Sequence, residues 1–312
     1  MADRRLQVFH AVAKHGSFTR AAEHLFMTQP AVTFQIKQLE EHFNTRLLDR
    51  GHGKISLTLA GELVLAYAER ILGLSEELES RVSELTDELS GVLNIGTSTT
   101  IAAYWLPQLL ESFKRRYPRV VPRVVVGNSQ LTEDRVAARE LDIGLIEIVT
   151  EQPAIEHFSA TRDALLVICA PTHPLAQATA LKASDLIEHP FITRDPGNAI
   201  REIAEEFFEA AGIPMSEVNV CAELGSLATV KHLAAEGMGF AIASQAAMLR
   251  DIREGRLVGI PLEPPLYTPL EVIIPRDKFR SRLITTFAEH ACAELAEMAA
   301  RVAEKAQQQG GA

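Results

Sequence analysis

The chain has 312 residues, of which 47% are hydrophobic and 23% charged, as expected for a globular protein with room for two or three domains. The longest apolar run, residues 164–170, is too short to cross a bilayer, and the N-terminus begins with charged residues instead of an apolar signal core. Three widely spaced cysteines (Cys169, Cys221 and Cys292) argue against a disulfide framework or a zinc site. We therefore expect a cytoplasmic protein with no metal and no cofactor.

The charge is distributed unevenly along the chain. The whole chain carries a net charge of −10, but residues 1–58 hold eight Lys or Arg against five Asp or Glu, a local charge of +3. The remainder therefore carries −13. A basic module on an acidic chain suggests that the N-terminal part attracts an anionic partner such as DNA while the rest repels it.

The first 58 residues predict a winged helix-turn-helix. Apolar positions repeat at helical spacing from Arg5 to Lys14, and a second short helix, which Thr19 is expected to cap, runs to Leu25. A tight turn leads to a third helix that opens at Gln29 and Pro30, since proline is tolerated in the first turn. Four apolar side chains of this helix are expected to face inward: Val32, Ile36, Leu39 and Phe43.

The outer face of the third helix has the groups that read base edges. Gln29 can pair with adenine, Thr33 can contact a base or a thymine methyl, and Lys37 can reach guanine or phosphate. Arg50 and Lys54 flank a glycine-rich turn between two short strands, a wing that would contact the DNA backbone or minor groove. Each residue alone is as easily a solvated surface residue, so the ordered set of elements is what indicates DNA binding.

Four runs in this module carry a family resemblance: FTRAAEHL at 18–25, TQPAVT at 28–33, QIKQLE at 35–40 and LTLAG at 57–61. They resemble the LysR-type transcriptional regulators, and the layout extends over almost the whole chain. Threonine stands at position 33, where serine is commoner in the family, and the wing reads Arg-Gly-His-Gly at 50–53. The resemblance and the helix pattern together give the expected DNA-binding set: Thr19, Arg20, Thr28, Gln29, Pro30, Ala31, Thr33, Phe34, Lys37, Arg50 and Lys54.

Residues 59–90 predict one long linker helix. Apolar side chains recur every three or four positions along it, from Val64 through Tyr67, Ile71, Leu74 and Leu78 to Leu89, and the outer positions are acidic. Such a stripe needs a partner, and pairing with a second copy of the chain is the simplest solution. Packing against the chain's own body is the alternative. The resemblance implies a homodimer, often a homotetramer, built on this helix.

Residues 91–300 alternate between apolar strands, among them 165–169 and 270–274, and helices, which predicts a parallel-rich α/β fold. We expect two lobes joined by two crossings of the chain, the first from 91–163 and 267–300 and the second from 164–266. The resemblance implies a two-lobed effector domain like that of periplasmic binding proteins. The tail at 301–312 is expected to be disordered.

Polar residues gather where the predicted strands end, which is where α/β folds bind ligands. Hydroxyls, amides and one arginine facing a cleft suit a small anion or polar metabolite, although Ser98, Thr99 and Thr100 could equally serve only as helix caps. Glu147 and Glu223 would repel an anion unless they are paired or bind its hydroxyls. The expected effector site contains Ser98, Thr99, Thr100, Asn128, Glu147, Thr193, Arg194, Asn198 and Glu223.

The resemblance adds a partner and a ligand class. The segments Ser98–Ile101 and Tyr104–Pro107 resemble the branch that regulates carbon dioxide fixation and sulfur or cysteine metabolism. That branch implies an oxyanion such as sulfite, or a phosphorylated sugar, in the cleft. Partners of such a regulator would be double-stranded DNA, the effector, a second copy and RNA polymerase, with no membrane.

Two other classes of protein were weighed. The chain has no nucleotide-binding glycine loop, no HExxH and no GxSxG, so we do not expect an enzyme. A solute-binding protein for transport would share the two-lobed fold, but the N-terminal DNA-binding module argues against it.

Overall fold

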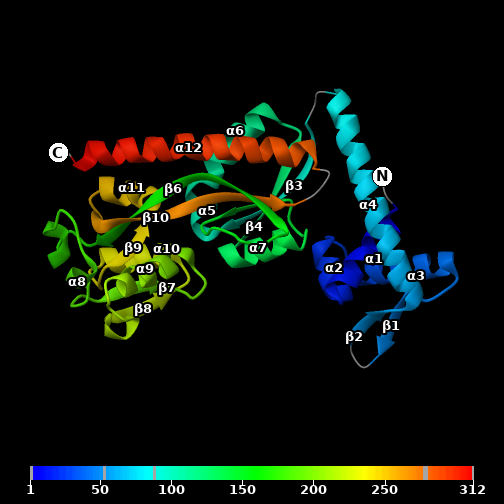
Figure 1. The fold of residues 1–312 in the computed structure, drawn as a ribbon, viewed down its shortest axis with the longest axis horizontal. Helices are drawn as coiled ribbons and strands as arrows, with labels where there is room; N and C mark the ends of the chain where they lie inside the picture. The colour runs from blue at the N-terminus through cyan, green and yellow to red at the C-terminus, as the bar shows by residue number, and fades with distance from the viewer. Residues whose placement is uncertain (1–2, 52–53, 87–88, 277–279, 311–312) are drawn as a thin grey trace. The chain divides into compact units, whose positions relative to one another are not determined.

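The computed structural model describes residues 3–51, 54–86, 89–276 and 280–310. The chain divides into two compact units, residues 1–88 and 89–312 (Figure 1). Across the described residues, the helices are too short or too polar to serve as membrane spans.

The first unit is a winged helix-turn-helix followed by one long helix (Figure 1). Apolar residues of the first three helices form its core, including Phe9, Val12, Ile36 and Leu39, which are at most 1% exposed. The two wing strands pair antiparallel. The elements are α1 (Arg4–His15), α2 (Phe18–His24), α3 (Gln29–Phe43), β1 (Leu48–Gly51), β2 (Lys54–Leu57) and α4 (Leu59–Thr86).

Two details of this unit differ from the sequence prediction. Ser17, not Thr19, caps α2: its hydroxyl accepts from the backbone N–H of Arg20. Ser17 is the last extended residue, so its hydroxyl faces the free N–H groups of the first turn. Phe43 was predicted to face inward but is 44% exposed, because it lies in the last turn of α3, beyond the residues that the core covers.

The second unit is built on a six-stranded sheet with the order β4-β3-β5-β10-β6-β9 and a two-stranded parallel pair, β7-β8. Strand β3 runs parallel to β4 and β5, whereas the long strands β6 and β10 pair antiparallel along almost their whole length. The strands are β3 (Gly91–Ser98), β4 (Val120–Gly127), β5 (Ile143–Ile146), β6 (Ile155–Cys169), β7 (Phe191–Arg194), β8 (Val220–Leu224), β9 (Ala241–Ser244) and β10 (Val258–Pro275).

Strands β6 and β10 cross between two lobes. The first lobe comprises the elements from β3 to β5 together with the last helix, and the second comprises those between β6 and β10. The helices are α5 (Thr99–Tyr104), α6 (Leu106–Arg116), α7 (Ser129–Ala137), α8 (Ala183–Leu186), α9 (Ala199–Ala210), α10 (Leu227–Ala235), α11 (Gln245–Arg253) and α12 (Arg282–Gly310), with single 3-10 turns η1 (Pro174–Gln177) and η2 (Met215–Glu217).

Alternate side chains of β10 pack on opposite faces of the sheet, with helices covering each face. Val272 and Ile274 pack with Leu109 and Phe287 of α6 and α12 on one face, while Ile273 packs with Val136 beside α7 on the other. Helix α12 lies along β6 and β10 (Figure 1). The second lobe has its own apolar clusters around β7 and β9.

Several boundaries of the linker helix and of the second unit differ from the sequence prediction. The linker helix ends at Thr86, and Leu89 belongs to the core of the first lobe, so it is not on the helical stripe. Strands β6 and β10 are far longer than the predicted strands at 165–169 and 270–274. The prediction was too short because polar residues alternate with apolar ones along the outer halves of both strands. Short helices α8 and α11 were not predicted.

The predicted disordered tail is wrong for residues 301–310, which continue α12 to Gly310. This segment is rich in Ala, Glu, Lys and Gln, all strong helix formers. Val302 also packs against the core of the first lobe. The high helix propensity of these residues and the packing of Val302 therefore explain why α12 continues through a segment that was predicted to be disordered. The last two residues, 311–312, lie outside the described residues.

Candidate ligand-binding pocket and nucleic-acid interface

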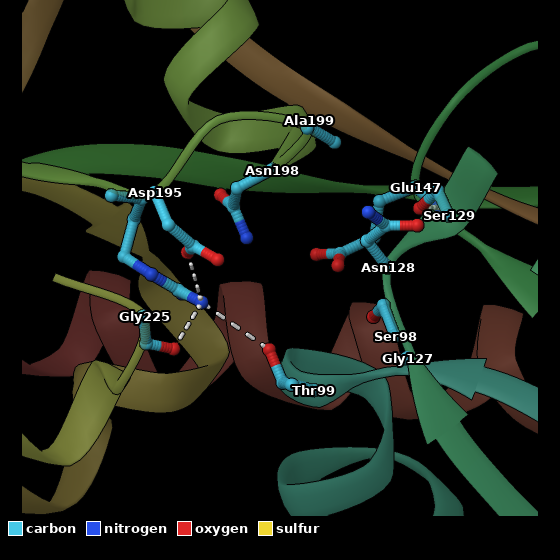
Figure 2. A pocket seen from close by; sticks show the side chains of 12 residues that line it. Ser98, Thr99, Gly127, Asn128, Ser129, Glu147, Asp195, Asn198, Ala199 and Gly225 are labelled. Carbon is cyan, nitrogen blue, oxygen red and sulfur yellow. Dashed lines mark hydrogen bonds and ion pairs between the residues drawn. The ribbon is translucent and has the colours of Figure 1, made fainter. Parts of the chain in front are cut away.

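A cavity of about 150 Å³ lies between the two lobes (Figure 2). Its walls are the turns that follow β3, β4 and β5 on one side and β7 and β8 on the other. The lining residues are Ser98, Thr99, Gly127, Asn128, Ser129 and Glu147 from the first lobe, and Arg194, Asp195, Gly197, Asn198, Ala199 and Gly225 from the second.

The first-lobe wall is made of helix caps. The Ser98 hydroxyl accepts from Ile101 N–H at 3.1 Å, and the Asn128 side chain accepts from Leu131 N–H at 2.7 Å. Ser129 Oγ accepts from the backbone N–H of Glu147 at 3.1 Å, which ties α7 to the end of β5. The predicted capping role of Ser98 is thus present, and the same residue also lines the pocket.

Two glycines allow α7 to lie close enough to the sheet to form this wall. A Cβ at Gly96 would come within 2.5 Å of the Leu141 side chain, and one at Gly144 within 2.6 Å of Ile273. Both positions also face the methyl group of Thr132 on α7. Any larger residue at either position would push α7, and the caps at its N-terminus, away from the strand ends.

Arg194 forms the second-lobe wall at the end of β7. Its Nε donates to Leu224 O at 3.2 Å, and its Nη2 donates to Gly225 O at 3.1 Å and to Thr99 Oγ1 at 3.4 Å. Asp195 Oδ1 lies 3.6 Å from Nη2. The contacts of Nη2 with Gly225, Thr99 and Asp195 are drawn as dashed lines in Figure 2. The residue is 5% exposed, and its Nη1 has no hydrogen-bond partner among the described residues.

Asn198 adds a polar group beside the arginine. Its Oδ1 caps α9 by accepting from the N–H groups of Ile200 and Arg201. Its side-chain nitrogen points into the pocket (Figure 2). The pocket therefore offers a cationic donor and an amide donor from the second lobe and hydroxyls from the first. This combination suits a small oxyanion.

Glu147, like Asp195, is an acidic residue of the lining. It is 2% exposed, and its Oε1 lacks a hydrogen-bond partner within the described chain. Burial raises the pKa of Glu147 to about 7, with a further increase from nearby Asp163 and an opposing effect from Ser98, Arg194 and Thr100. Burial likewise raises the pKa of Asp163 to about 6 and lowers that of Arg194, against the opposing charges of Asp195 and Glu147.

Six of the nine predicted effector residues line the pocket: Ser98, Thr99, Asn128, Glu147, Arg194 and Asn198. The other three do not. Thr100 is buried one residue inside α5, Thr193 is buried in β7, and Glu223 is exposed and bonds to Arg201. Thr193 precedes Arg194 in β7, and successive residues of a strand point to opposite faces, so Thr193 points away from the pocket.

Sequence reasoning did not select six lining residues: Gly127, Ser129, Asp195, Gly197, Ala199 and Gly225. All of them lie in the same strand-end turns as the predicted residues, so proximity in sequence was an available signal. Among the described residues, no group of three His, Cys, Asp or Glu side chains is placed to hold a metal ion.

The predicted DNA-reading surface lies on α2 and α3. Thr19, Thr28, Gln29, Phe34 and Lys37 are exposed, and Phe34 is 58% exposed although it is aromatic.

Two contacts organise the polar groups of this surface. Gln29 Nε2 donates to Thr33 Oγ1 at 3.0 Å, and Lys37 Nζ lies 3.6 Å from Glu41. Arg20 and Pro30 are also exposed, and Ala31 is half-buried. The strands of the wing are described, but the side chains of Arg50 and Lys54 lie outside the described residues.

Two family descriptions match the chain. "Bacterial regulatory helix-turn-helix protein, lysR family" matches residues 4–62, and "LysR substrate binding domain" matches residues 86–296. Together they cover the winged helix and the two lobes. The second match alone spans more than half of the chain.

Named relatives and solved structures agree with this match. A "Probable RuBisCO transcriptional regulator" of Porphyra purpurea is 32% identical over 289 residues, 91% of each protein. The Synechocystis CcmR regulatory domain, solved in complex with 2-PG, is 25% identical with a TM-score of 0.60, covering 65% of this chain and 97% of that one. Corynebacterium glutamicum OxyR shares the fold at 22% identity and a TM-score of 0.66, covering 97% and 95%.

Proposed function

Since the chain belongs to the LysR family of transcriptional regulators, we propose that its DNA binding is set by a small anion held by Arg194, Thr99 and Asn198. Members of this family combine a helix-turn-helix that binds DNA with an effector-binding domain, so the chain is a DNA-binding transcription regulator. What we propose beyond this role is that the effector is an anion and that these three residues hold it.

The unpartnered nitrogen of Arg194 carries this proposal. A buried donor without an acceptor costs about 1–3 kcal/mol, and more when the donor is charged. Arg194 lines a polar cavity, and its Nη1 has no acceptor in the described part of the chain. An oxyanion in the cavity would satisfy it, together with the Asn198 amide. The complex of Synechocystis CcmR with 2-PG supports a small ligand of this kind.

The anion would also bridge the two lobes. Arg194 and Asn198 belong to the second lobe, and Thr99 and Ser98 to the first. A ligand bound to both sides favours the closed arrangement of the lobes because it contacts both walls only when they are close. We propose that this shift in population is what changes DNA binding.

Two copies of the chain would pair through α4. Five apolar side chains on one side of this helix are exposed by 43–63%: Leu63, Tyr67, Ile71, Leu74 and Leu78. Their spacing of three and four residues matches a coiled-coil seam. Pairing would bury the seam and carry two DNA-reading helices to adjacent half-sites. A homotetramer, contact with RNA polymerase and a cytoplasmic location would all fit this role.

Carbon-fixation genes are the targets that we propose, because several relatives are named as probable RuBisCO regulators. Purified protein mixed with fragmented genomic DNA, followed by sequencing of the retained fragments, tests this proposal. We expect retained sites upstream of such genes and retention that falls steeply with salt. A protein that retains no DNA at low salt would contradict the DNA-binding role, whereas sites beside unrelated genes would contradict only the proposed targets.

A further inference from the structure

Three residues that line the pocket have a buried polar atom without a hydrogen-bond partner among the described residues: Arg194 Nη1, Glu147 Oε1 and Asp195 Oδ1. Arg194 Nη1 belongs to the second lobe and Glu147 Oε1 to the first, and both residues are at most 5% exposed. The Glu147 carboxylate points into the pocket in Figure 2. The arginine explains why an anion would bind here. The glutamate requires a separate explanation, because an ionised carboxylate would repel that anion.

The size of the pocket makes this repulsion severe. An anion in a cavity of about 150 Å³ cannot move far from Glu147. At about 4 Å, two like charges repel by about 4 kcal/mol even at an effective dielectric constant of about 20. The backbone of Glu147 is held in place by two hydrogen bonds. Its backbone N–H donates to Ser129, and its carbonyl accepts from Thr268 Oγ1 at 3.4 Å.

We propose that Glu147 is a proton-carrying ligand of the anion: its protonated carboxyl donates a hydrogen bond to an anion oxygen, so binding a fully ionised anion takes up one proton. This inference rests on the proposed function of the pocket. It makes Glu147 a specificity residue, and it makes effector binding sensitive to pH near neutrality.

Burial and one neighbouring carboxylate favour the protonated form of Glu147, and the other groups around it oppose that form. Glu147 is faced by Asp163 from β6, Arg194 from β7, and the hydroxyls of Ser98 and Thr100 from the end of β3 and the start of α5. Burial is the largest influence and Asp163 adds to it, so the pKa of Glu147 is about 7, although Ser98, Arg194 and Thr100 oppose the rise. An anion beside the carboxylate would raise it further.

The alternative role for Glu147 is as an acceptor. An ionised carboxylate could accept a hydrogen bond from a hydroxyl of the ligand. In that case the pocket would prefer a ligand that brings its own proton, and binding would not weaken as the pH rises. The two roles therefore predict opposite responses to a ligand that has no proton to give.

Sulfate distinguishes these roles, because it stays fully ionised at any pH at which the protein is folded. Isothermal titration of the full chain with sodium sulfate is carried out at about pH 6 and about pH 8.5, in buffers of different ionisation enthalpy. We expect wild-type affinity to fall by about tenfold per pH unit above the pKa of Glu147. Proton uptake should be small at about pH 6, where the carboxyl is already protonated, and approach one proton per sulfate at about pH 8.5. The Glu147→Gln variant, whose amide always donates, should bind with equal affinity at both pH values and take up no proton.

Variants of two other buried carboxyl groups show which residue takes up the proton when sulfate binds. Glu271→Gln changes another buried glutamate, which lies outside the pocket lining and bonds to His157, and it should keep the wild-type pH dependence. Thermal unfolding of each variant checks that it is folded. A pH dependence that survives in Glu147→Gln but is lost in Asp163→Asn would assign the proton to Asp163 and overturn the inference.

Two further outcomes separate this inference from the proposed function. Wild-type affinity for sulfate that is equal at both pH values, or binding of inorganic phosphate at about pH 6 with no binding of sulfate, would overturn the role of Glu147 and leave the anion site standing. If wild type and Glu147→Gln bind neither anion at either pH, the anion site itself is wrong.

Discussion

Arg194 Nη2 lies 3.4 Å from Thr99 Oγ1, so a side chain of one lobe donates directly to a side chain of the other across the pocket (Figure 2). The same guanidinium is anchored on its own lobe by the carbonyls of Leu224 and Gly225. Arg194 is therefore both a contact between the lobes and the cation of the candidate site. An anion that binds Nη1 would strengthen the same connection.

Removing this guanidinium should weaken anion binding. We expect Arg194→Ala to lose at least about tenfold in affinity for sulfate at about pH 6, because hydrogen bonds to charged groups contribute about 1.5–3 kcal/mol. Titration calorimetry measures this loss. Arg162→Ala is the matched control, since Arg162 is exposed, stacks on Tyr267 and lies outside the pocket. Equal affinity of Arg194→Ala and wild type would exclude Arg194 as the anion ligand.

Two changes on α3 should weaken DNA binding in different ways. Thr33→Ala removes a hydroxyl from the DNA-reading surface, and we expect a loss of about 1–3 kcal/mol at a specific site if it contacts a base. Lys37→Ala should weaken binding to all sequences and lower the slope of log affinity against log salt by about 1. Fluorescence anisotropy on a retained genomic fragment measures both.

Lys182→Ala is the control for these variants, because Lys182 is an exposed lysine in the second unit, paired with Glu263. Unchanged DNA affinity in both Thr33→Ala and Lys37→Ala would refute the assignment of α3 as the recognition helix.

Much of the pocket was predictable because its chemistry follows from helix capping. Ser98, Asn128 and Asn198 cap helices that begin at strand ends, and sequence patterns reveal both the strand and the cap. The orphaned Nη1 of Arg194 and the burial of Glu147 could not be predicted. They depend on which residues of a distant segment lie opposite, and no local pattern encodes that.

The errors in the fold have a similar origin. The prediction placed Leu89 on the helical stripe because spacing alone decided it, whereas its packing with Leu93 and Phe287 places it in the other unit. Strands β6 and β10 were predicted too short, since their outer halves mix polar and apolar residues and are held by pairing between segments about a hundred residues apart. Periodicity within one segment cannot detect such pairing.

A charge on the exposed seam of α4 should prevent self-association. Leu74→Glu and Leu78→Glu would each place a charge in the paired interface, which costs roughly 3 kcal/mol or more. We expect sedimentation to show a smaller assembly than wild type. Ala66→Glu is the control, because Ala66 is exposed on the same helix but lies off the seam. A wild-type assembly in both leucine variants would rule out α4 as the dimer contact.

The raised pKa of Glu147 predicts how stability depends on pH. The folded chain holds this proton more tightly than the unfolded chain, whose glutamate titrates near 4.5, so the free energy of unfolding falls as the pH rises from 4.5 to about 7. Glu147→Gln should remove that part of the decrease and be more stable than wild type at about pH 8, by at most about 3 kcal/mol. Urea unfolding without added anions measures it, with Glu271→Gln as the control. A Glu147→Gln variant that is less stable than wild type at that pH would contradict the burial of an ionisable carboxyl.

The central claim is that an anion in the pocket controls DNA binding, and one measurement tests it most directly. DNA affinity is measured by fluorescence anisotropy on a retained genomic site, with and without sulfate at about pH 6, at constant ionic strength, for wild type and Arg194→Ala. The account predicts that sulfate changes the affinity of wild type by about fivefold or more and leaves Arg194→Ala unchanged. A wild-type protein that binds sulfate yet keeps the same DNA affinity, or an equal change in both proteins, would contradict it.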